Sequence, residues 1–305
     1  MRPTVAAIEE WKQRRHAIVL AHNYQTPDIF HGVADLSGDS LALAQQAAST
    51  DAEVIVLAGV HFMAETAAIQ CPDKRVLIPD PAAGCSLAAT IDAEQLRAWK
   101  AEHPGAVVVS YVNTTAEVKA ETDICCTSSN AVEVVESLGV PRVIFLPDEY
   151  LGRYVASHTA VEVILWKGHC IVHERFTAAE IQRFRDAYGG QLEVLAHPEC
   201  PPEVLAASDF VGSTSGMVRH LKEAPAPRVL LVTECSMSDN VAVDFPRIEF
   251  VRPCNLCPYM KRITLPKILE SLIHLQYEVT VDPAVAGRAR QAVERMLAVG
   301  RGRGG

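Results

Sequence analysis

The sequence predicts an α/β protein made of three similar domains, each built on a parallel β-sheet. Amphipathic segments with helical periodicity alternate with short, continuous apolar runs rich in β-branched residues, which are typical of buried parallel strands. The same order of segments recurs at a step of about 87 residues along the 305-residue chain. Regular alternation of strands and helices favours parallel sheets with right-handed crossovers.

The repeat begins with four expected helix starts. Threonine stands at positions 4, 90, 177 and 264, where we expect it to be the N-cap, and the steps are 86, 87 and 87 residues. Thr177 and Glu180 also match a capping box. The helices expected after these caps are Ala7–Arg15, Ala93–His103, Ala179–Tyr188 and Lys267–Gln276.

Apolar runs after the first three helices are predicted to be strands. The first strands of the units are Ala17–Ala21, Ala106–Val109 and Leu192–Ala196. The second strands are Glu53–Ala58, Asp123–Cys126 and Asp209–Val211, and the third are Arg75–Ile78, Arg142–Leu146 and Arg228–Val232. Fourth strands are expected at Val161–Trp166 and Ile248–Val251, and Tyr277–Val281 is the candidate that completes the first unit.

These segments divide the chain into three predicted domains, each within the usual size range. Residues 1–88 form the first, and residues 265–305 are expected to complete it with a helix from Ala284 and a loose glycine- and arginine-rich tail. Residues 89–175 form the second domain and residues 176–264 the third. All βα units look somewhat alike, but the nearly constant step favours a true repeat.

Composition argues against several classes of protein. The chain has 28 basic and 37 acidic residues, a formal net charge of −9, and no long basic run, so nucleic acid is not an expected partner. No apolar stretch reaches the roughly 18 residues that suggest a membrane helix. Residues 1–15 lack the apolar core of a signal peptide. We therefore expect a cytoplasmic protein without a membrane partner.

Cysteine use points to metal or redox chemistry. Nine cysteines in a reducing compartment make a disulfide framework unfavourable. Cys125 and Cys126 lie in an apolar segment and are expected to be small buried hydrophobes.

Three cysteines follow the repeat. Cys85, Cys170 and Cys257 are separated by 85 and 87 residues, so each unit supplies one from an equivalent loop. Three converging thiolates suit an iron–sulfur cubane that leaves one iron open as a Lewis acid. Zinc, which takes a fourth ligand, and thiol redox chemistry remain alternatives, because Cys254 and Cys257 form a Cys-x-x-Cys pair.

Polar side chains follow the predicted strands, where parallel sheets bind ligands. Histidine and glutamate can move protons near neutral pH, tyrosine can donate to an oxyanion, and Ser or Thr at helix starts suits phosphate or carboxylate. For one Ser or Thr, plain N-capping is the simpler explanation, and His22 and His197 could each be a core histidine. The expected site residues are His22, Tyr24, Ser40, Tyr111, Asn113, Ser128, His197, Glu199, Ser213 and Thr214.

Short motifs in a fixed order then become recognisable. They are His22–Gln25, Gly38–Ser40, Tyr111–Thr114, Cys126–Ala131, Pro147-Asp148, Gly168–Cys170, His197–Cys200, Gly212–Gly216 and Cys257–Lys261. Together they make the chain resemble the quinolinate synthase (NadA) family along almost its whole length. The resemblance implies three analogous domains arranged with pseudo-threefold symmetry around a central [4Fe–4S] cluster held by Cys85, Cys170 and Cys257.

The resemblance also implies an activity. The family is a transferase that condenses iminoaspartate with dihydroxyacetone phosphate to quinolinate, phosphate and water in de novo NAD biosynthesis, so a functional link to the enzyme that supplies iminoaspartate is expected. Glu199 would be the base with His197 nearby, and Tyr24 and His22 would move protons. Met260 would line the cavity. The other residues expected to bind carboxylates or phosphate are Ser40, Tyr111, Asn113, Ser128, Ser213 and Thr214, besides His22, His197 and Glu199.

Two other functions remain open at this point. An iron–sulfur hydro-lyase acting on a hydroxy acid would use the same open iron, and a zinc- or thiol-stabilised binding protein would use none. The segment Cys235–Asn240 departs from many relatives, which have a glycine after the Thr-Glu pair, so its loop is expected to differ locally. Cys254 resembles an accessory cysteine of some members.

Overall fold

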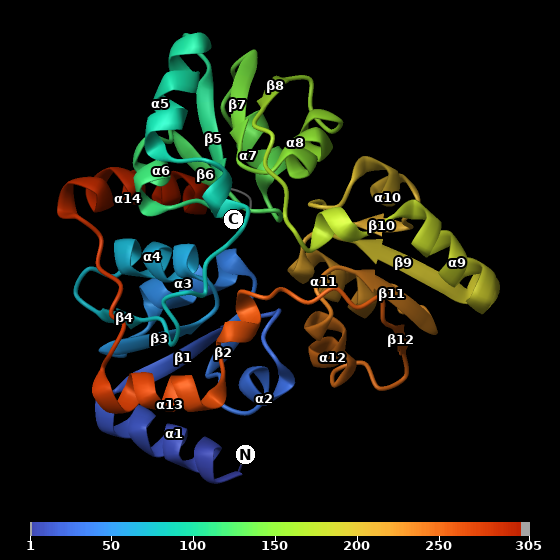
Figure 1. The fold of residues 1–305 in the computed structure, drawn as a ribbon. Coiled ribbons are helices and arrows are strands. Elements are labelled where there is room, and N and C mark those ends of the chain that lie inside the picture. The colour runs from blue at the N-terminus through green and yellow to red at the C-terminus, as the bar shows by residue number, and fades with distance from the viewer. Residues whose placement is uncertain (1, 300–305) are drawn as a thin grey trace.

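The computed structural model describes residues 2–299 and contains three parallel, four-stranded sheets. Their strand orders are β2-β1-β3-β4, β6-β5-β7-β8 and β10-β9-β11-β12, so all three share one topology. Figure 1 shows each sheet with its helices as a separate lobe, and the three lobes surround the middle of the molecule. The predicted α/β fold is therefore confirmed. The predicted domain limits stay a prediction.

The first unit comprises the β1–β4 sheet and helices α1–α4. In order these are α1 (Arg2–Arg15), β1 (Ala17–His22), α2 (Pro27–Phe30), β2 (Leu36–Gly38), α3 (Ser40–Ser49), β3 (Val54–Ala58), α4 (His61–Gln70) and β4 (Arg75–Leu77). A 3₁₀ helix, η1 (Ala88–Thr90), leads to the next unit.

The second unit comprises the β5–β8 sheet and helices α5–α8. These are α5 (Ala93–Glu102), β5 (Val107–Tyr111), α6 (Ala116–Ala120), β6 (Ile124–Cys126), α7 (Ala131–Ser137), β7 (Arg142–Leu146), α8 (Glu149–Ala156) and β8 (Glu162–Leu165). The 3₁₀ helix η2 (His173–Arg175) follows.

The third unit comprises the β9–β12 sheet and helices α9–α12. These are α9 (Ala178–Tyr188), η3 (Gly189–Gln191), β9 (Leu192–Ala196), α10 (Pro202–Ala206), β10 (Phe210–Val211), α11 (Thr214–Glu223), β11 (Arg228–Val232), α12 (Ser236–Ala242) and β12 (Glu249–Val251). The chain ends with η4 (Met260–Arg262), α13 (Leu265–His274) and α14 (Pro283–Ala298).

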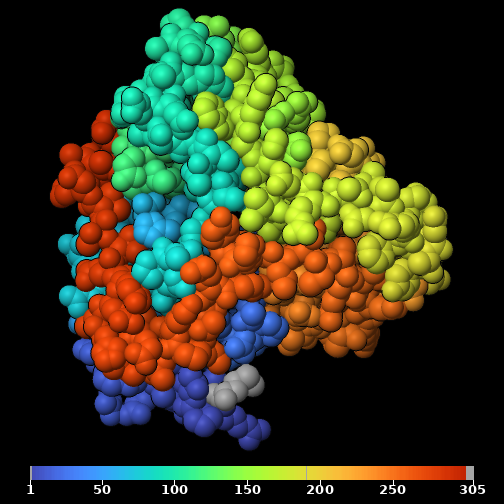
Figure 2. All heavy atoms as spheres, in the orientation of Figure 1, coloured from blue at the N-terminus to red at the C-terminus, as the bar shows by residue number. Residues whose placement is uncertain are grey.

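The two C-terminal helices return to the first half of the chain. Helix α13 lies beside α1, and α14 contacts α6 and β6 of the second unit as well as α4 of the first. Figure 2 shows these orange and red segments covering the blue and cyan N-terminal parts of the surface. The expected tail, residues 301–305, lies outside the described residues.

Two of the four expected threonine caps are correct. Thr177 caps α9 in a capping box with Glu180, and Thr264 occupies the N-cap of α13. The prediction is wrong for Thr4, because α1 already begins at Arg2, and for Thr90, which ends η1. Asp92 caps α5 instead, because its carboxylate accepts from the backbone N–H of Gln95 at 2.8 Å and the Gln95 side chain bonds back.

Most predicted strands are confirmed within one or two residues, but two assignments in the first unit are wrong. Tyr277–Val281 forms no strand and makes only an isolated bridge between Leu77 and Glu278. The strand that the sequence did not predict is β2, at the edge of the first sheet. Its three residues are largely exposed and form no apolar run. Because β2 precedes it in the chain, β3 is the third strand of its unit and not the second, as predicted. It corresponds to β7 and β11, and these three strands pair with β1, β5 and β9.

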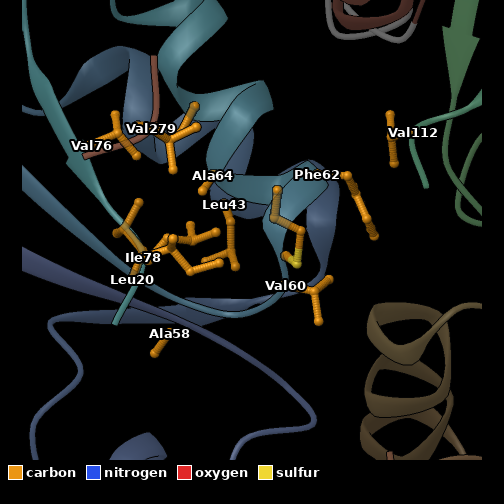
Figure 3. Packing of buried hydrophobic residues seen from close by; sticks show 14 of the residues in the cluster. Leu20, Leu43, Ala58, Val60, Phe62, Ala64, Val76, Ile78, Val112 and Val279 are labelled. Carbon is orange, nitrogen blue, oxygen red and sulfur yellow. The ribbon is translucent and has the colours of Figure 1, made fainter. Parts of the chain in front are cut away.

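The apolar core is divided unevenly among the three units. One cluster joins buried residues of the first and second units with α13 and α14, and Figure 3 shows Val112 of the second unit near Phe62 of the first. No described residue of β9–β12 or α9–α12 belongs to this cluster, whereas Met260 and Ile263, which follow the third sheet, do. The third sheet is packed by two further clusters, and Tyr24 of the first unit contacts both the shared cluster and one of these. Cys125 and Cys126 are fully buried in the shared cluster, as predicted.

The described part of the chain contains no helix with both the length and the apolar character required to span a membrane.

Candidate active site and cluster site

A single cavity receives side chains from all three units. Its walls bound about 740 Å³ of space outside the protein atoms, part of which is open to solvent. The cavity is lined by nine of the ten expected site residues, namely His22, Tyr24, Ser40, Tyr111, Asn113, Ser128, His197, Glu199 and Thr214, and by Cys85, Cys170 and Cys257. Met260 also lines it, whereas Ser213 does not.

The repeat explains why these side chains meet. His22 and Tyr111 are the last residues of β1 and β5, and His197 follows the last residue of β9. These are the equivalent central strands of the three sheets. Because the carboxyl ends of the three central strands reach the same cavity, residues far apart in the chain become neighbours.

The three cysteines occupy equivalent positions in the fold. Cys85, Cys170 and Cys257 each stand three residues before a 3₁₀ helix, η1, η2 and η4 respectively. The carbonyl oxygen of each accepts from the backbone N–H four residues later, at 3.1, 2.9 and 3.1 Å. Each cysteine also lies in the connection between two units. The repeat therefore brings one thiol from each connection to the cavity.

The setting of these thiols fits an iron–sulfur cluster. Burial raises the pKa of Cys85 to about 12 and the pKa values of Cys170 and Cys257 above their usual value. In each case the backbone N–H groups two and three residues later bond to the sulfur and counteract this effect. Such N–H donors stabilise sulfur as a thiolate ligand, and three thiolates suit a cubane cluster.

A disulfide lies close to this site. Cys235 and Cys254 are bonded, with their Cα atoms 4.9 Å apart, so one disulfide is present although a disulfide framework was judged unfavourable. The remaining seven cysteines are free. The two cysteines approach because residues 234 and 255 form a bridge and Cys235 N–H donates to Asn255 O at 3.1 Å. Because the sulfur of Cys254 is bonded to Cys235, it cannot act together with Cys257 as a zinc-binding or redox-active Cys-x-x-Cys pair.

Glu199 is the centre of a buried polar cluster. Its Oε1 accepts from the Tyr111 hydroxyl at 2.6 Å, and its Oε2 lies 2.9 Å from His173 Nδ1. Burial alone would raise the pKa of Glu199, but the charge of His173 or His197 when either is protonated, and the hydrogen bonds from His173 and the Tyr111 hydroxyl, lower it below its usual value. Glu199 therefore remains a carboxylate although it is buried.

A hydrogen-bonded chain continues from His173 to Tyr24. His173 Nε2 lies 2.9 Å from Thr233 Oγ1, which lies 2.7 Å from the Tyr24 hydroxyl. His173 Nδ1 lies within reach of both Glu199 Oε2, at 2.9 Å, and Cys170 Sγ, at 3.3 Å. A carboxylate and a thiolate both accept, so Nδ1 carries the proton, Nε2 accepts from Thr233, and Thr233 accepts from Tyr24. Burial raises the pKa of Tyr24 well above its usual value, so its phenol keeps its proton in the free protein.

Two neutral histidines complete this part of the cavity. Burial lowers the pKa of His22 to about 4 and that of His197 to about 3, so both rings are neutral at pH 7. Nδ1 of each ring accepts from the backbone N–H two residues later, at 3.2 Å for Tyr24 and 3.4 Å for Glu199. The proton of each neutral ring is therefore on Nε2, which makes both residues hydrogen-bond donors there.

Binding of anions in this cavity has to rely on neutral donors. No lysine or arginine is among the described residues that line it. Ser40 and Thr214 are the first residues of α3 and α11, helices of ten residues whose N-terminal N–H groups attract anions. The side-chain oxygen of Asn113 is buried without a hydrogen-bond partner in the described structure. Ser213 instead caps α11, its Oγ accepting from Gly216 N–H.

Comparison with known proteins decides the family. A family model described as quinolinate synthetase A protein matches residues 6–298. The chain belongs to this family. Quinolinate synthase 2 of Mesorhizobium japonicum is 62% identical over 295 residues, covering 97% of this chain and 91% of the relative. Quinolinate synthase of Agrobacterium fabrum is 63% identical over 296 residues, covering 97% of this chain and 85% of the relative. The Caulobacter vibrioides enzyme is 56% identical over 299 residues, covering 97% and 81%.

The resemblance seen in the sequence motifs is therefore confirmed, and the quinolinate synthase family uses a [4Fe–4S] cluster. Sequence reasoning missed His173 and Asp39 among the residues that line the cavity. His173 stands three residues after Cys170, as Met260 stands three residues after Cys257, so the repeat carried a signal for it. Asp39 was included only as part of the Gly38–Ser40 motif.

Proposed function

We propose that this chain is a quinolinate synthase, which condenses iminoaspartate with dihydroxyacetone phosphate to give quinolinate, phosphate and water in NAD biosynthesis. The observation that carries the proposal is that one thiol from each connection between units lines the same cavity as the Tyr, His and Glu residues of the strand ends. The reducing cytoplasm is the proposed location, because the three thiols must stay reduced to bind a cluster.

Cys85, Cys170 and Cys257 are the residues that would hold the [4Fe–4S] cluster. When bound, the cluster supplies a Lewis-acidic iron that can polarise a substrate oxygen. The equivalent backbone N–H donors around the three sulfurs support this assignment.

Substrate binding is assigned to neutral donors near the helix starts. Ser40 and Thr214 combine a hydroxyl group with the N-terminus of a ten-residue helix, which suits carboxylate and phosphate groups. Asn113 and Ser128 line the same cavity, where the Asn113 amide nitrogen and the Ser128 hydroxyl can donate to an anion. The Asn113 oxygen, which has no partner within the described protein, can accept from a substrate hydroxyl or N–H group. His22 and His197 would donate from Nε2. Ser213 supports this region as the cap of α11 rather than as a ligand.

Proton transfer is assigned to the chain from Tyr24 to Glu199. Since the Tyr24 hydroxyl donates to Thr233, its oxygen can accept a substrate proton while its own proton moves through Thr233 to His173 Nε2. The imidazolium formed in this way is held by the Glu199 carboxylate at 2.9 Å. Glu199 therefore acts as the base through His173, and its second oxygen keeps Tyr111 in place.

The proposal is tested with anaerobically purified protein whose iron–sulfur content has been restored. Iminoaspartate generated in the assay and dihydroxyacetone phosphate should give quinolinate and phosphate in equal amounts, with about four irons per chain, as a cubane requires. Protein with full iron content that makes no quinolinate but dehydrates a hydroxy acid would establish the hydro-lyase instead. Zinc without iron would establish the binding protein.

A further inference from the structure

Asp39 connects all three units of the molecule. It is the N-cap of α3 in the first unit, where Oδ1 accepts from Ala42 N–H at 2.9 Å. Its Oδ2 lies 3.1 Å from Ser129 Oγ of the second unit and 2.6 Å from Ser215 Oγ of the third. The side chain is 9% exposed. One carboxylate thus bonds to three segments that are distant in sequence.

The direction of these hydrogen bonds can be derived. A carboxylate only accepts, so in the bonds to Asp39 the hydroxyl groups of Ser129 and Ser215 are the donors. Ser129 has a single proton, which its Oγ can donate to Asp39 Oδ2 or to Ser213 Oγ, 2.9 Å away. Ser213 Oγ in turn accepts from Gly216 N–H at 3.1 Å. The hydroxyl protons of Ser129 and Ser215 are committed to this network rather than to a ligand.

Each member of the network is the chain neighbour of a proposed binding residue. Ser40 follows Asp39, Ser128 precedes Ser129, and Thr214 precedes Ser215, and all three neighbours line the cavity. A carboxylate at this place repels an anionic ligand, and no lysine or arginine forms an ion pair with Asp39 within residues 2–299. The contribution of Asp39 to binding must therefore come through the loops that it joins.

We propose that Asp39 is a positioning residue that holds the three ligand-binding loops at a fixed separation. The inference rests on the proposed function for the identity of the ligands, which are the carboxylate and phosphate groups of the two substrates. Hydrogen bonds to a charged acceptor are stronger than neutral ones, so one side chain can fix three loops without a covalent link. Removing the acceptor oxygen lets Ser40, Ser128 and Thr214 move apart.

The deciding variant is Asp39→Asn. Asparagine caps a helix as well as aspartate does, so the bond to Ala42 is kept, but its amide nitrogen cannot accept from two hydroxyl groups. We expect KM for the substrates to rise about tenfold or more, the effect of losing at least one hydrogen bond to a charged group, with kcat within about threefold. Asp92→Asn is the matched control, because Asp92 caps α5 in the same way but, among residues 2–299, its hydrogen bonds stay within its own helix start.

Two results would overturn the proposal on kinetic grounds. If Asp39 acted only through its charge, the neutral variant would bind anionic substrates more tightly and KM would fall. An unchanged KM would show that the network does not set the loop positions.

A measurement that does not depend on turnover separates this inference from the proposed function. In the cluster-loaded protein without substrate, Asp39→Asn should increase hydrogen–deuterium exchange in the segments around Ser129 and Ser215, and Asp92→Asn should not. Unchanged exchange in both segments overturns the inference, even if KM rises. If the wild type makes no quinolinate, the proposed function fails while the exchange result still decides the role of Asp39.

Discussion

The first two units and the third unit are held in the molecule by different forces. The first and second share one continuous apolar cluster, extended by α13 and α14. The buried residues of the third sheet form clusters of their own, and Tyr24 of the first unit packs against one of them. The third unit also meets the others through hydrogen bonds, such as Asn240 Nδ2 to Gln25 O at 2.8 Å and Tyr111 to Glu199 at 2.6 Å. Apolar contacts are nondirectional, whereas a buried hydrogen bond is lost when either its donor or its acceptor is removed. The position of the third unit therefore depends on the groups in the cavity.

Loss of a cluster ligand should have the largest effect and should separate the two kinds of interface. Cys170 and Cys257 lie in the two connections that flank the third unit. We expect Cys170→Ala to abolish turnover and cluster incorporation, and to increase hydrogen–deuterium exchange in the third unit while the first two change little. Iron and sulfide analysis and exchange measurements check this. Cys71→Ala, a buried free thiol that does not line the cavity, is the control and should keep its iron. Full iron content in the Cys170 variant would contradict the ligand assignment.

Glu199→Gln tests the polar contacts of the third unit at a residue that is also assigned to proton transfer. Glutamine can still accept from Tyr111, but it cannot stabilise a positive charge on His173 as a carboxylate does. We expect kcat to fall by about 10²–10⁴, the range for loss of acid–base catalysis, with normal iron content and little change in KM. Steady-state kinetics on reconstituted protein measure both. Turnover close to that of the wild type would remove Glu199 from the proton path.

The sequence predicts the parts of this molecule that repeat and misses those that depend on contacts between repeats. Cys85, Cys170 and Cys257 could be aligned because equal steps place them before equivalent 3₁₀ helices. Taking Asp92 as the cap of α5 makes the spacing of the caps match that of the cysteines, and this correction was within reach of the sequence. Strand β2 was not, because its three residues have no apolar pattern.

Residues that act across units could not be placed from one sequence. Asp39 and Ser215 are 176 positions apart, and only the packed structure shows that their oxygens are in contact. The Cys235–Cys254 disulfide joins residues 19 positions apart. It forms because the segments around Glu234 and Asn255 lie side by side in a parallel bridge. A serine at a helix start can either bind a ligand or cap the helix, and sequence alone does not separate the two. Ser213 was expected to bind substrate, but its hydroxyl caps α11 instead.

The two neutral histidines make the polar interface sensitive to acid. The pKa of His197 is about 3 in the folded protein and near 6.5 when unfolded, so between these values the unfolded chain binds more protons. Stability is therefore complete above about pH 6.5 and is lost as the pH falls. Between pH 6.5 and 5 we expect the opening free energy of the third unit to fall by about 2 kcal/mol because of His197. His197→Asn should remove that part of the dependence in native-state hydrogen exchange. An equal pH dependence in the variant would show that His197 does not contribute.

Truncating a side chain in the apolar cluster shared by the first two units should have the smallest effect on activity. It tests the apolar interface, as the variants above test the polar one. Met296 of α14 is 1% exposed and belongs to the cluster that joins the first two units. Met296→Ala should lower the free energy of unfolding by about 2–5 kcal/mol, because it leaves a cavity in a packed apolar core. Both KM and kcat should stay near the wild-type values, since no group in the active cavity moves.

The matched variant in the third unit is Met237→Ala, a fully buried methionine of a cluster whose buried members all belong to that unit. Hydrogen exchange should increase in the first and second units together for Met296→Ala, because α14 contacts α4 and α6, and in the third unit alone for Met237→Ala. If Met296→Ala increased exchange in the third unit to the same extent, the apolar core would extend through all three units. The hydrogen bonds around the cavity would then only orient a unit that is already fixed by packing.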